Sequence, residues 1–156
     1  SNGYSLIRKI LENHRSKVKP SIIEDLLMPT RIYADSIQKL LNSIEILGMA
    51  HITGGGLTEN LPRMLKSNES SILLEMNSWK IPEIFNWLQK NGNIARQEML
   101  RTFNCGVGFV ICVSADQAKK TCNLLKSYNE KAWVIGEIAS PDALEKETQL
   151  LIHGAG

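Results

Sequence analysis

The chain has 156 residues, 43% of them hydrophobic and 22% charged, which is the composition of a folded domain and excludes a disordered or collagen-like chain. Its 18 basic and 16 acidic residues leave a formal charge of +2. This balance is too even for a protein that binds nucleic acid through concentrated positive charge. No apolar run approaches the roughly 20 residues of a membrane helix, so we expect neither nucleic acid nor a membrane as a partner.

Hydrophobic periodicity along the chain predicts helices that alternate with apolar, β-branched strands. Pro82 is expected to open one helix and Gly92 to end it. The alternation predicts a single α/β (α+β) domain in which helices flank a central mixed β-sheet. The expected helices cover residues 4–14, 21–28, 32–44, 58–65, 82–92, 95–102 and 116–128, and the expected strands cover 46–53, 71–75, 107–113, 132–138 and 149–153.

The three cysteines, Cys105, Cys112 and Cys122, show neither CxxC nor Cys/His spacing. We therefore expect no metal site and no disulfide framework, but reduced thiols in a cytoplasmic protein. Cys105 has neither a base nor a helix N-terminus beside it in the sequence, which favours a packed thiol over a nucleophile.

The strongest chemical motif is HITGGGLTEN at residues 51–60. Its three glycines stand between an expected strand and an expected helix, where they allow positive φ angles and the close approach of a phosphate to the backbone. The motif is neither a Walker loop nor GxGxxG, and on the glycines alone a flexible turn is somewhat the better interpretation. The balance shifts toward a ligand site because polar groups crowd onto this segment, at His51, Thr53, Glu59, Asn60 and Arg63.

Two charged or titratable side chains of this motif each allow two interpretations. His51 is either a core histidine at the end of a strand or a group that transfers protons near neutral pH. Glu59 is either part of the ligand site or an acidic residue in the first turn of a helix, where the helix dipole stabilises it by roughly 0.3–1 kcal/mol.

A second motif, RTFNCGVG at residues 101–108, places two glycines at the start of an expected buried strand. Arg101 would supply a guanidinium fork and Asn104 an amide at this bend, which suits an anionic ligand. The alternative is an ordinary turn with a surface arginine. At the N-terminus, residues 1–3 are expected either to cap the first helix or to contact a phosphate.

Five segments of the chain stand in the order found in phosphoribosylformylglycinamidine cyclo-ligases, also called aminoimidazole ribonucleotide synthetases. The chain resembles this family from Ser1 to about Gly136, and HITGGG together with RTFNCGVG is the most specific part of the resemblance. The five segments are SNGYS at 1–5, LMPTRIY at 27–33, HITGGGLTENLPR at 51–63, WKIPEIFNWLQ at 79–89 and EMLRTFNCGVG at 98–108.

The resemblance implies an ATP-dependent ligase of de novo purine synthesis. Such an enzyme phosphorylates the formyl oxygen of formylglycinamidine ribonucleotide, and the ribose-bearing nitrogen then attacks the activated carbon. The imidazole ring closes, and ADP and phosphate are released. The ring-closed product is aminoimidazole ribonucleotide.

The resemblance also implies a domain organisation. ATP and magnesium would be held mainly by an N-terminal domain that is absent from this chain, so that residues 1–156 form the C-terminal half of a two-domain enzyme. The chain alone is expected to be inactive, its partner is its own N-terminal domain, and the full-length enzyme is expected to be a homodimer. The alternative is a non-catalytic nucleotide- or phosphate-binding module.

The resemblance further implies site residues by their positions. His51 is the catalytic candidate, and no metal ligand is expected. The expected contacts to substrate or phosphate are Ser1, Asn2, Gly3, Thr53, Gly54, Gly55, Gly56, Asn60, Arg63, Arg101, Asn104, Gly106 and Gly108.

Overall fold

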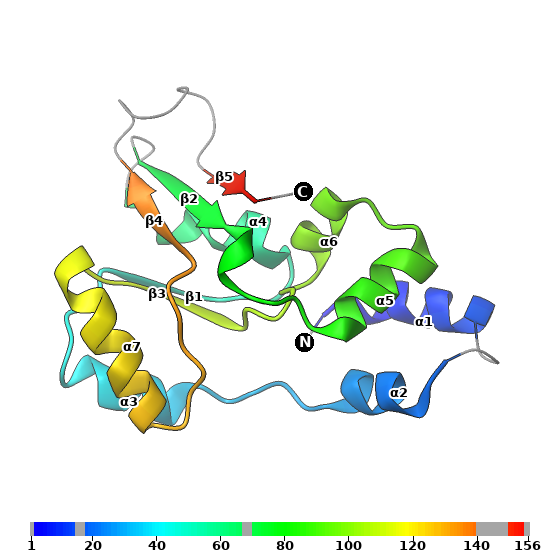
Figure 1. The fold of residues 1–156 in the computed structure, drawn as a ribbon, viewed down its shortest axis with the longest axis horizontal. Helices are drawn as coiled ribbons and strands as arrows, with labels where there is room; N and C mark the ends of the chain where they lie inside the picture. The colour runs from blue at the N-terminus through cyan, green and yellow to red at the C-terminus, as the bar shows by residue number, and fades with distance from the viewer. Residues whose placement is uncertain (1, 15–17, 67–69, 140–149, 155–156) are drawn as a thin grey trace. The chain divides into compact units, whose positions relative to one another are not determined.

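The computed structural model describes residues 2–14, 18–66, 70–139 and 150–154. Helices and strands alternate along these residues (Figure 1), which confirms the mixed α/β class predicted from the sequence. The elements are α1 (Tyr4–His14), α2 (Pro20–Leu27), α3 (Ala34–Leu41), β1 (Gly48–His51), α4 (Gly56–Asn60), β2 (Ser71–Glu75), α5 (Glu83–Gly92), α6 (Arg96–Thr102), β3 (Phe109–Cys112), α7 (Ala118–Ser127), β4 (Gly136–Ala139) and β5 (Leu150–His153), with short 3₁₀ turns at Pro62–Met64, Met76–Ser78 and Ala115–Gln117.

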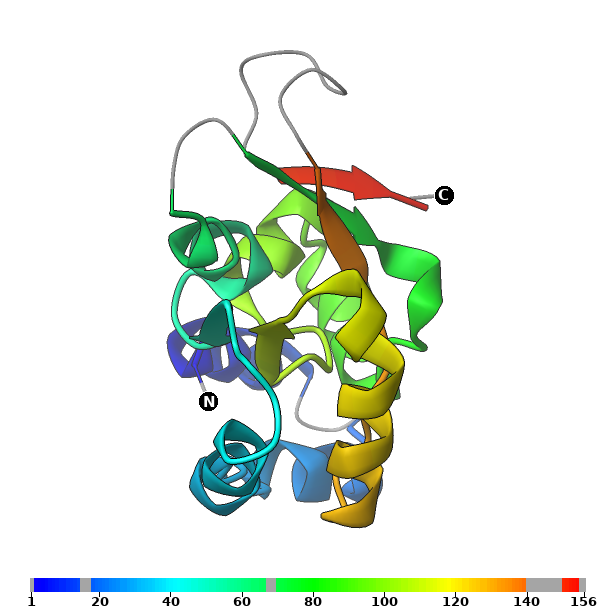
Figure 2. The ribbon, with the colours of Figure 1, turned by 90° about the vertical axis from the view of Figure 1, so that its left-hand side faces the viewer.

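The described strands form two small sheets, where the sequence analysis expected one central sheet. β1 and β3 make an antiparallel pair in which His51 lies opposite Phe109. β2 lies between β4, which is antiparallel to it, and β5, which is parallel to it (Figure 2). β4 and β5 occupy both edges of β2. Neither β1 nor β3 can therefore pair with β2.

The chain divides into two compact units, each assembled from three segments. Unit 1 comprises residues 1–31, 52–59 and 81–108, and unit 2 comprises residues 32–51, 60–80 and 109–156. Unit 1 contains α1, α2, α5 and α6, whereas both sheets, α3 and α7 belong to unit 2. Within the described part of the chain, no helix is long and apolar enough to cross a membrane.

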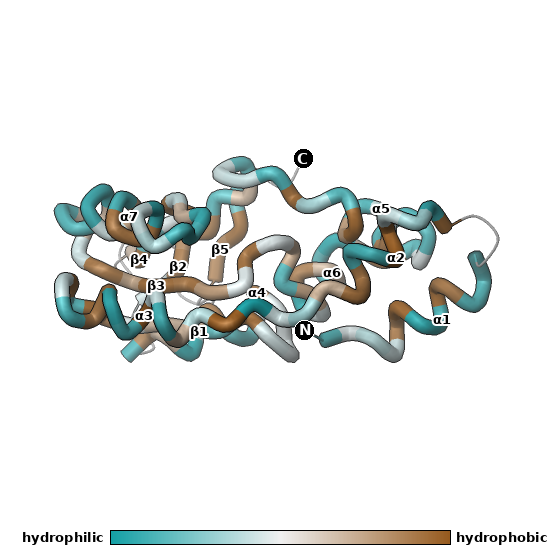
Figure 3. Tube along the Cα trace, turned by 90° about the horizontal axis from the view of Figure 1, so that it is seen from below, coloured by the Kyte–Doolittle hydropathy of each residue, from teal (hydrophilic) through white to brown (hydrophobic). Residues whose placement is uncertain are grey.

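The core of unit 1 comes from the apolar stripes of its helices. Hydrophobic and hydrophilic positions alternate along α1 at helical spacing (Figure 3), and this places Ile7 and Ile10 in the interior. α5 contributes Ile84 and Leu88, and α6 contributes Met99 and Leu100 to the buried set. The contact of α1 with α5 is thus made by the apolar faces that the sequence predicts.

The end of α5 differs from the expectation that Gly92 stops the helix. Gly92 is the last helical residue, and Asn93 adopts the left-handed conformation that ends it, with φ of 47°. The N–H of Ile94 then donates to the carbonyl of Gln89 at 3.0 Å. A side chain at Gly92 would come within 2.7 Å of Cδ1 of Ile10, so this glycine serves the packing of α5 against α1.

Unit 2 is built around side chains that are almost fully buried. Leu40 of α3 is 0% exposed, and Leu74 of β2 is 1% exposed. α3 contacts α7, and next to this contact the hydroxyl of Ser36 donates to Oε1 of Glu130 at 2.7 Å. This hydrogen bond gives the hydroxyl of Ser36 a partner. Without one, burying the hydroxyl would destabilise the folded protein.

Candidate functional site

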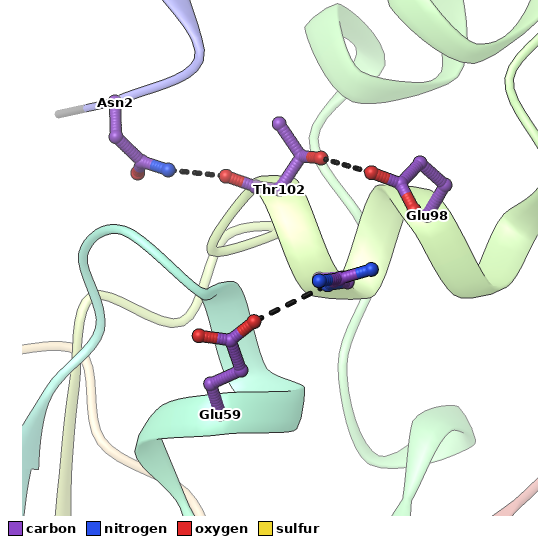
Figure 4. Close-up of polar contacts among 5 residues, drawn as sticks. Asn2, Glu59, Glu98 and Thr102 are labelled. Atoms are coloured by element: carbon purple, nitrogen blue, oxygen red, sulfur yellow. Dashed lines mark hydrogen bonds and ion pairs between the residues drawn. The ribbon is translucent and has the colours of Figure 1, made fainter.

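Three of the predicted motif segments meet within unit 1. They are Asn2 with Gly3, residues 52–59 and residues 101–108. The last two segments are joined by a backbone hydrogen bond from the N–H of Ile52 to the carbonyl of Gly108, at 2.9 Å. The side-chain contacts that join the segments are drawn in Figure 4.

The N-terminal segment reaches the end of helix α6. The side-chain amide of Asn2 donates to the carbonyl of Thr102, which is the last residue of α6 (Figure 4). A carbonyl in the last turn of a helix has no partner within that helix, so Asn2 caps α6 from outside. This role replaces the expected capping of the first helix by the Asn2 amide, and Ser1 lies outside the described residues.

Position 3 requires a glycine because its backbone lies close to the end of α6. Its φ is +77°, and a Cβ at this position would press into the ring of Phe103, with Cζ 3.1 Å away. Phe103 itself is 3% exposed and packs against Phe85 at a centroid distance of 5.9 Å. Gly3 therefore lets the N-terminal backbone lie directly on the buried ring of Phe103.

The three consecutive glycines have different surroundings. Gly56 has φ of +55°, and a Cβ there would come within 2.8 Å of the Arg101 carbonyl carbon and the Phe103 oxygen, and closer still to the Leu100 oxygen. Gly56 therefore lets the backbone of this segment pack against the backbone of α6. A Cβ at Gly54 would meet no described atom within 4 Å, and its φ lies outside the left-handed region. Neither the space nor the backbone conformation requires a glycine at position 54.

Gly55 makes room for a carboxylate. Its φ is +92°, and a Cβ there would lie 2.6 Å from Oε2 of Glu59. The other carboxylate oxygen of Glu59 accepts a hydrogen bond from Nε of Arg101 at 3.2 Å (Figure 4). Glu59 thus bridges the glycine segment and Arg101. From the sequence, Glu59 is either part of the ligand site or an acidic residue in the first turn of a helix, and neither interpretation predicts its contact with Arg101.

The turn at residues 104–108 is held by its own polar groups. Oδ1 of Asn104 accepts from the N–H of Gly106 at 3.0 Å, and the carbonyl of Asn104 accepts from the N–H of Val107 at 2.9 Å. Cys105 and Gly106 both have positive φ, of 48° and 98°. The side-chain oxygen of Asn104 is therefore used to build the turn.

Cys105 is a packed thiol, as the sequence predicts. It is 2% exposed, and its Sγ donates to the carbonyl of Met99 at 3.6 Å. Burial raises its pKa to about 12, and the positive charge of Arg96 opposes this shift only in part. Because the thiolate is the nucleophilic form, a nucleophilic role for this cysteine is disfavoured.

His51 belongs to unit 2, where it is part of an aromatic cluster. Its ring stacks on Phe109 at a centroid distance of 6.0 Å and forms a T-shaped contact with Tyr33 at 5.8 Å. Tyr33 and Phe109 also contact each other at 5.2 Å. The side chain of His51 is exposed, so the interpretation of His51 as a core histidine is wrong.

Asn60 and Arg63 also belong to unit 2 and contact each other. Nη1 of Arg63 donates to Oδ1 of Asn60 at 3.1 Å. Asn60 is 4% exposed, whereas Arg63 is exposed. The arginine thus satisfies a buried amide oxygen. Across the described residues, no group of three or more His, Cys, Asp or Glu side chains is placed to hold a metal ion.

One family model matches the chain, over residues 1–146. It is described as AIR synthase related protein, C-terminal domain. The matched range contains every motif segment described above, and it includes residues of both units.

Proposed function

This chain belongs to the family of AIR synthase related proteins, C-terminal domain, and from that premise we propose that it is the C-terminal domain of a phosphoribosylformylglycinamidine cyclo-ligase. The reaction would consume ATP and formylglycinamidine ribonucleotide, close the imidazole ring, and release ADP and phosphate. The full-length enzyme would be a cytoplasmic homodimer.

The observation that carries this proposal is the convergence of the three motif segments in unit 1. Asn2 bonds to Thr102, Glu59 bonds to Arg101, and Ile52 bonds to Gly108. Two of the three segments, residues 52–59 and 101–108, belong to the motifs that resemble the cyclo-ligases most specifically. Their meeting in space supports a shared ligand site, because nothing in the sequence requires segments so far apart to touch.

The chemistry of this site suits an anion. The open side of Gly54 allows a ligand to reach the backbone, and Arg101, which is 63% exposed, offers a guanidinium for two parallel hydrogen bonds to a phosphate. Phosphoryl transfer depends on positioning and on charge stabilisation more than on a covalent nucleophile. We assign these groups to the binding of a phosphorylated ligand.

His51 is the proposed proton carrier. Ring closure requires the attacking nitrogen to lose a proton, and an exposed imidazole can accept it. Phe109 and Tyr33 restrict the orientation of the ring through their aromatic contacts. General acid–base groups contribute about 10²–10⁴-fold to rate, so His51→Ala is expected to lower kcat by at least about 100-fold.

ATP and magnesium enter the proposal as ligands of a second, N-terminal domain. The described residues of this chain present no cluster of metal ligands, so we assign it no magnesium ligand and derive no step through the metal. What the residues of unit 1 would do is bind the ribonucleotide and orient it.

The proposal is tested by comparing residues 1–156 alone with a protein in which they follow an ATP-binding domain of the same family. We expect no ADP formation from the chain alone, and joint formation of ADP and aminoimidazole ribonucleotide from the two-domain protein. Ligand binding without turnover by the two-domain protein would instead indicate a non-catalytic phosphate-binding module. Full activity of His51→Ala would remove the role of His51.

A further inference from the structure

We propose that Glu59 is a positioning residue, which holds Arg101 through Nε so that the terminal nitrogens of its guanidinium bind the phosphate monoester of the ribonucleotide. This inference rests on the proposed function, because it assigns the phosphate of that ligand to Arg101. It adds Glu59 to the site, and it gives the carboxylate a role other than stabilising a helix.

The geometry of the ion pair leaves one edge of the guanidinium available. Oε1 of Glu59 accepts from Nε of Arg101 at 3.2 Å. Arginine has five N–H donors in a fixed plane, and Nε supplies only one of them. The terminal nitrogens of Arg101 form no hydrogen bond within the described part of the chain, and its side chain is 63% exposed. The free edge is the one that binds phosphate with two parallel hydrogen bonds.

The position of Glu59 is fixed by the glycine segment. A Cβ at Gly55 would lie 2.6 Å from Oε2 and 2.7 Å from Cβ of Glu59, so the absence of a side chain at position 55 makes room for this carboxylate. The N–H of Glu59 also donates to the carbonyl of Gly55 at 3.0 Å. One carboxylate oxygen therefore faces the loop, and the other faces Arg101.

Folding stability does not explain this arrangement well. Arg101 and Glu59 are 63% and 45% exposed, and ion pairs this open to water contribute little to stability. A fixed guanidinium is useful for binding, however, because a side chain that is already ordered loses less freedom when the ligand arrives. The pair is therefore better explained as preparation for an anion.

The test measures phosphate binding in the two-domain protein, with ribose 5-phosphate as the probe and ribose as its uncharged control. Isothermal calorimetry would be run on the wild type, Glu59→Ala, Arg101→Ala and the double variant. We expect Arg101→Ala to weaken binding at least about tenfold. Glu59→Ala should weaken binding about two- to fivefold, which corresponds to the free energy of an exposed ion pair. In a protein that already carries Arg101→Ala, Glu59→Ala should have no further effect.

Two controls separate positioning from general damage. Glu59→Gln keeps an oxygen that can accept from Nε, so it should restore more than half of the lost affinity. Glu83→Ala, which removes another exposed carboxylate of unit 1, should bind like the wild type. In turnover, Glu59→Ala should raise KM for the ribonucleotide and leave kcat within about twofold. A loss of structure would instead lower the melting temperature of the variant.

Two results would overturn the inference. Additive effects of Glu59→Ala and Arg101→Ala would show that the two residues act independently. Equal binding of ribose and ribose 5-phosphate, or no binding of either, would show that Arg101 is not a phosphate contact. Absence of turnover together with the expected coupling in ribose 5-phosphate binding would refute the proposed function and leave the phosphate site standing.

Discussion

Gly54, Gly55 and Gly56 are adjacent in the sequence, but a side chain at each position would have different surroundings. Gly56 approaches the backbone of α6, Gly55 approaches the carboxylate of Glu59, and a side chain at Gly54 would point into open space. The motif alone identifies all three as conformationally permissive. It cannot separate a glycine needed for packing from one that leaves space for a ligand, because that difference depends on atoms far away in the sequence.

This distinction predicts opposite effects for two alanine substitutions. Gly56→Ala should lower the free energy of unfolding by at least about 2 kcal/mol, because it combines a left-handed backbone with a steric overlap. Gly54→Ala should leave that free energy unchanged or raise it by up to about 1 kcal/mol, since it restricts only the unfolded chain. Urea titration of the two variants measures both values.

The Gly54→Ala variant, which is expected to fold, also predicts an effect on ligand binding. Its added methyl group would occupy the space that the proposed ligand needs, so its affinity for ribose 5-phosphate should fall although its stability does not. A Gly54→Ala variant that binds as tightly as the wild type would place the ligand elsewhere.

Cys105 should make the stability of the protein depend on alkaline pH. Burial raises its pKa from 9.0 to about 12 in the folded state. Above pH 9 the unfolded chain therefore releases a proton that the folded protein keeps, and stability falls as pH rises through the window between these two values. At pH 10 this one group should cost about 1.4 kcal/mol relative to pH 8.

The matched variant for this measurement is Cys105→Ala, which removes the titrating group. Its free energy of unfolding should decline less than that of the wild type between pH 8 and pH 10, by about the same 1.4 kcal/mol. Identical pH profiles of the two proteins would mean that the thiol ionises as freely in the folded state as in the unfolded one.

Among the elements, those with strong local patterns were predicted closely. α1 covers residues 4–14 and β2 covers 71–75, as the apolar spacing indicates. β4 instead starts at Gly136, although Trp133 and Val134 favour a strand. The pairing partner explains this difference. β2 ends at Glu75 and continues into a 3₁₀ turn, so it offers no further ladder positions to the residues before Ile135.

The C-terminus of α5 gives a testable prediction for a single helix. Asn93 ends the helix with φ of 47°, a conformation that glycine adopts without strain and β-branched residues resist. Asn93→Gly should leave stability unchanged or slightly raised, whereas Asn93→Val should lower it by about 1–2 kcal/mol. Thermal unfolding of both variants checks this order, and a Val variant as stable as the wild type would contradict the assigned cap.

For the molecule as a whole, the motifs could be found in the sequence, but their contacts could not. Asn2 and Thr102 are bonded although they are 100 residues apart, and the pattern that flags each of them carries no information about the other. The pairing of Glu59 with Arg101 could not be predicted for the same reason, since the two residues are 42 positions apart. The division of the strands into two sheets likewise depends on which edges of β2 are already occupied.

We propose that this chain serves a cyclo-ligase that activates the formyl oxygen of its substrate. The most direct measurement gives the two-domain protein formylglycinamidine ribonucleotide with oxygen-18 in the formyl group, together with ATP and magnesium, and analyses the products by mass spectrometry. We expect aminoimidazole ribonucleotide and ADP in equal amounts, with the heavy oxygen in the released phosphate. Unlabelled phosphate, or ATP consumption without ring closure, would contradict the proposed cyclo-ligase reaction.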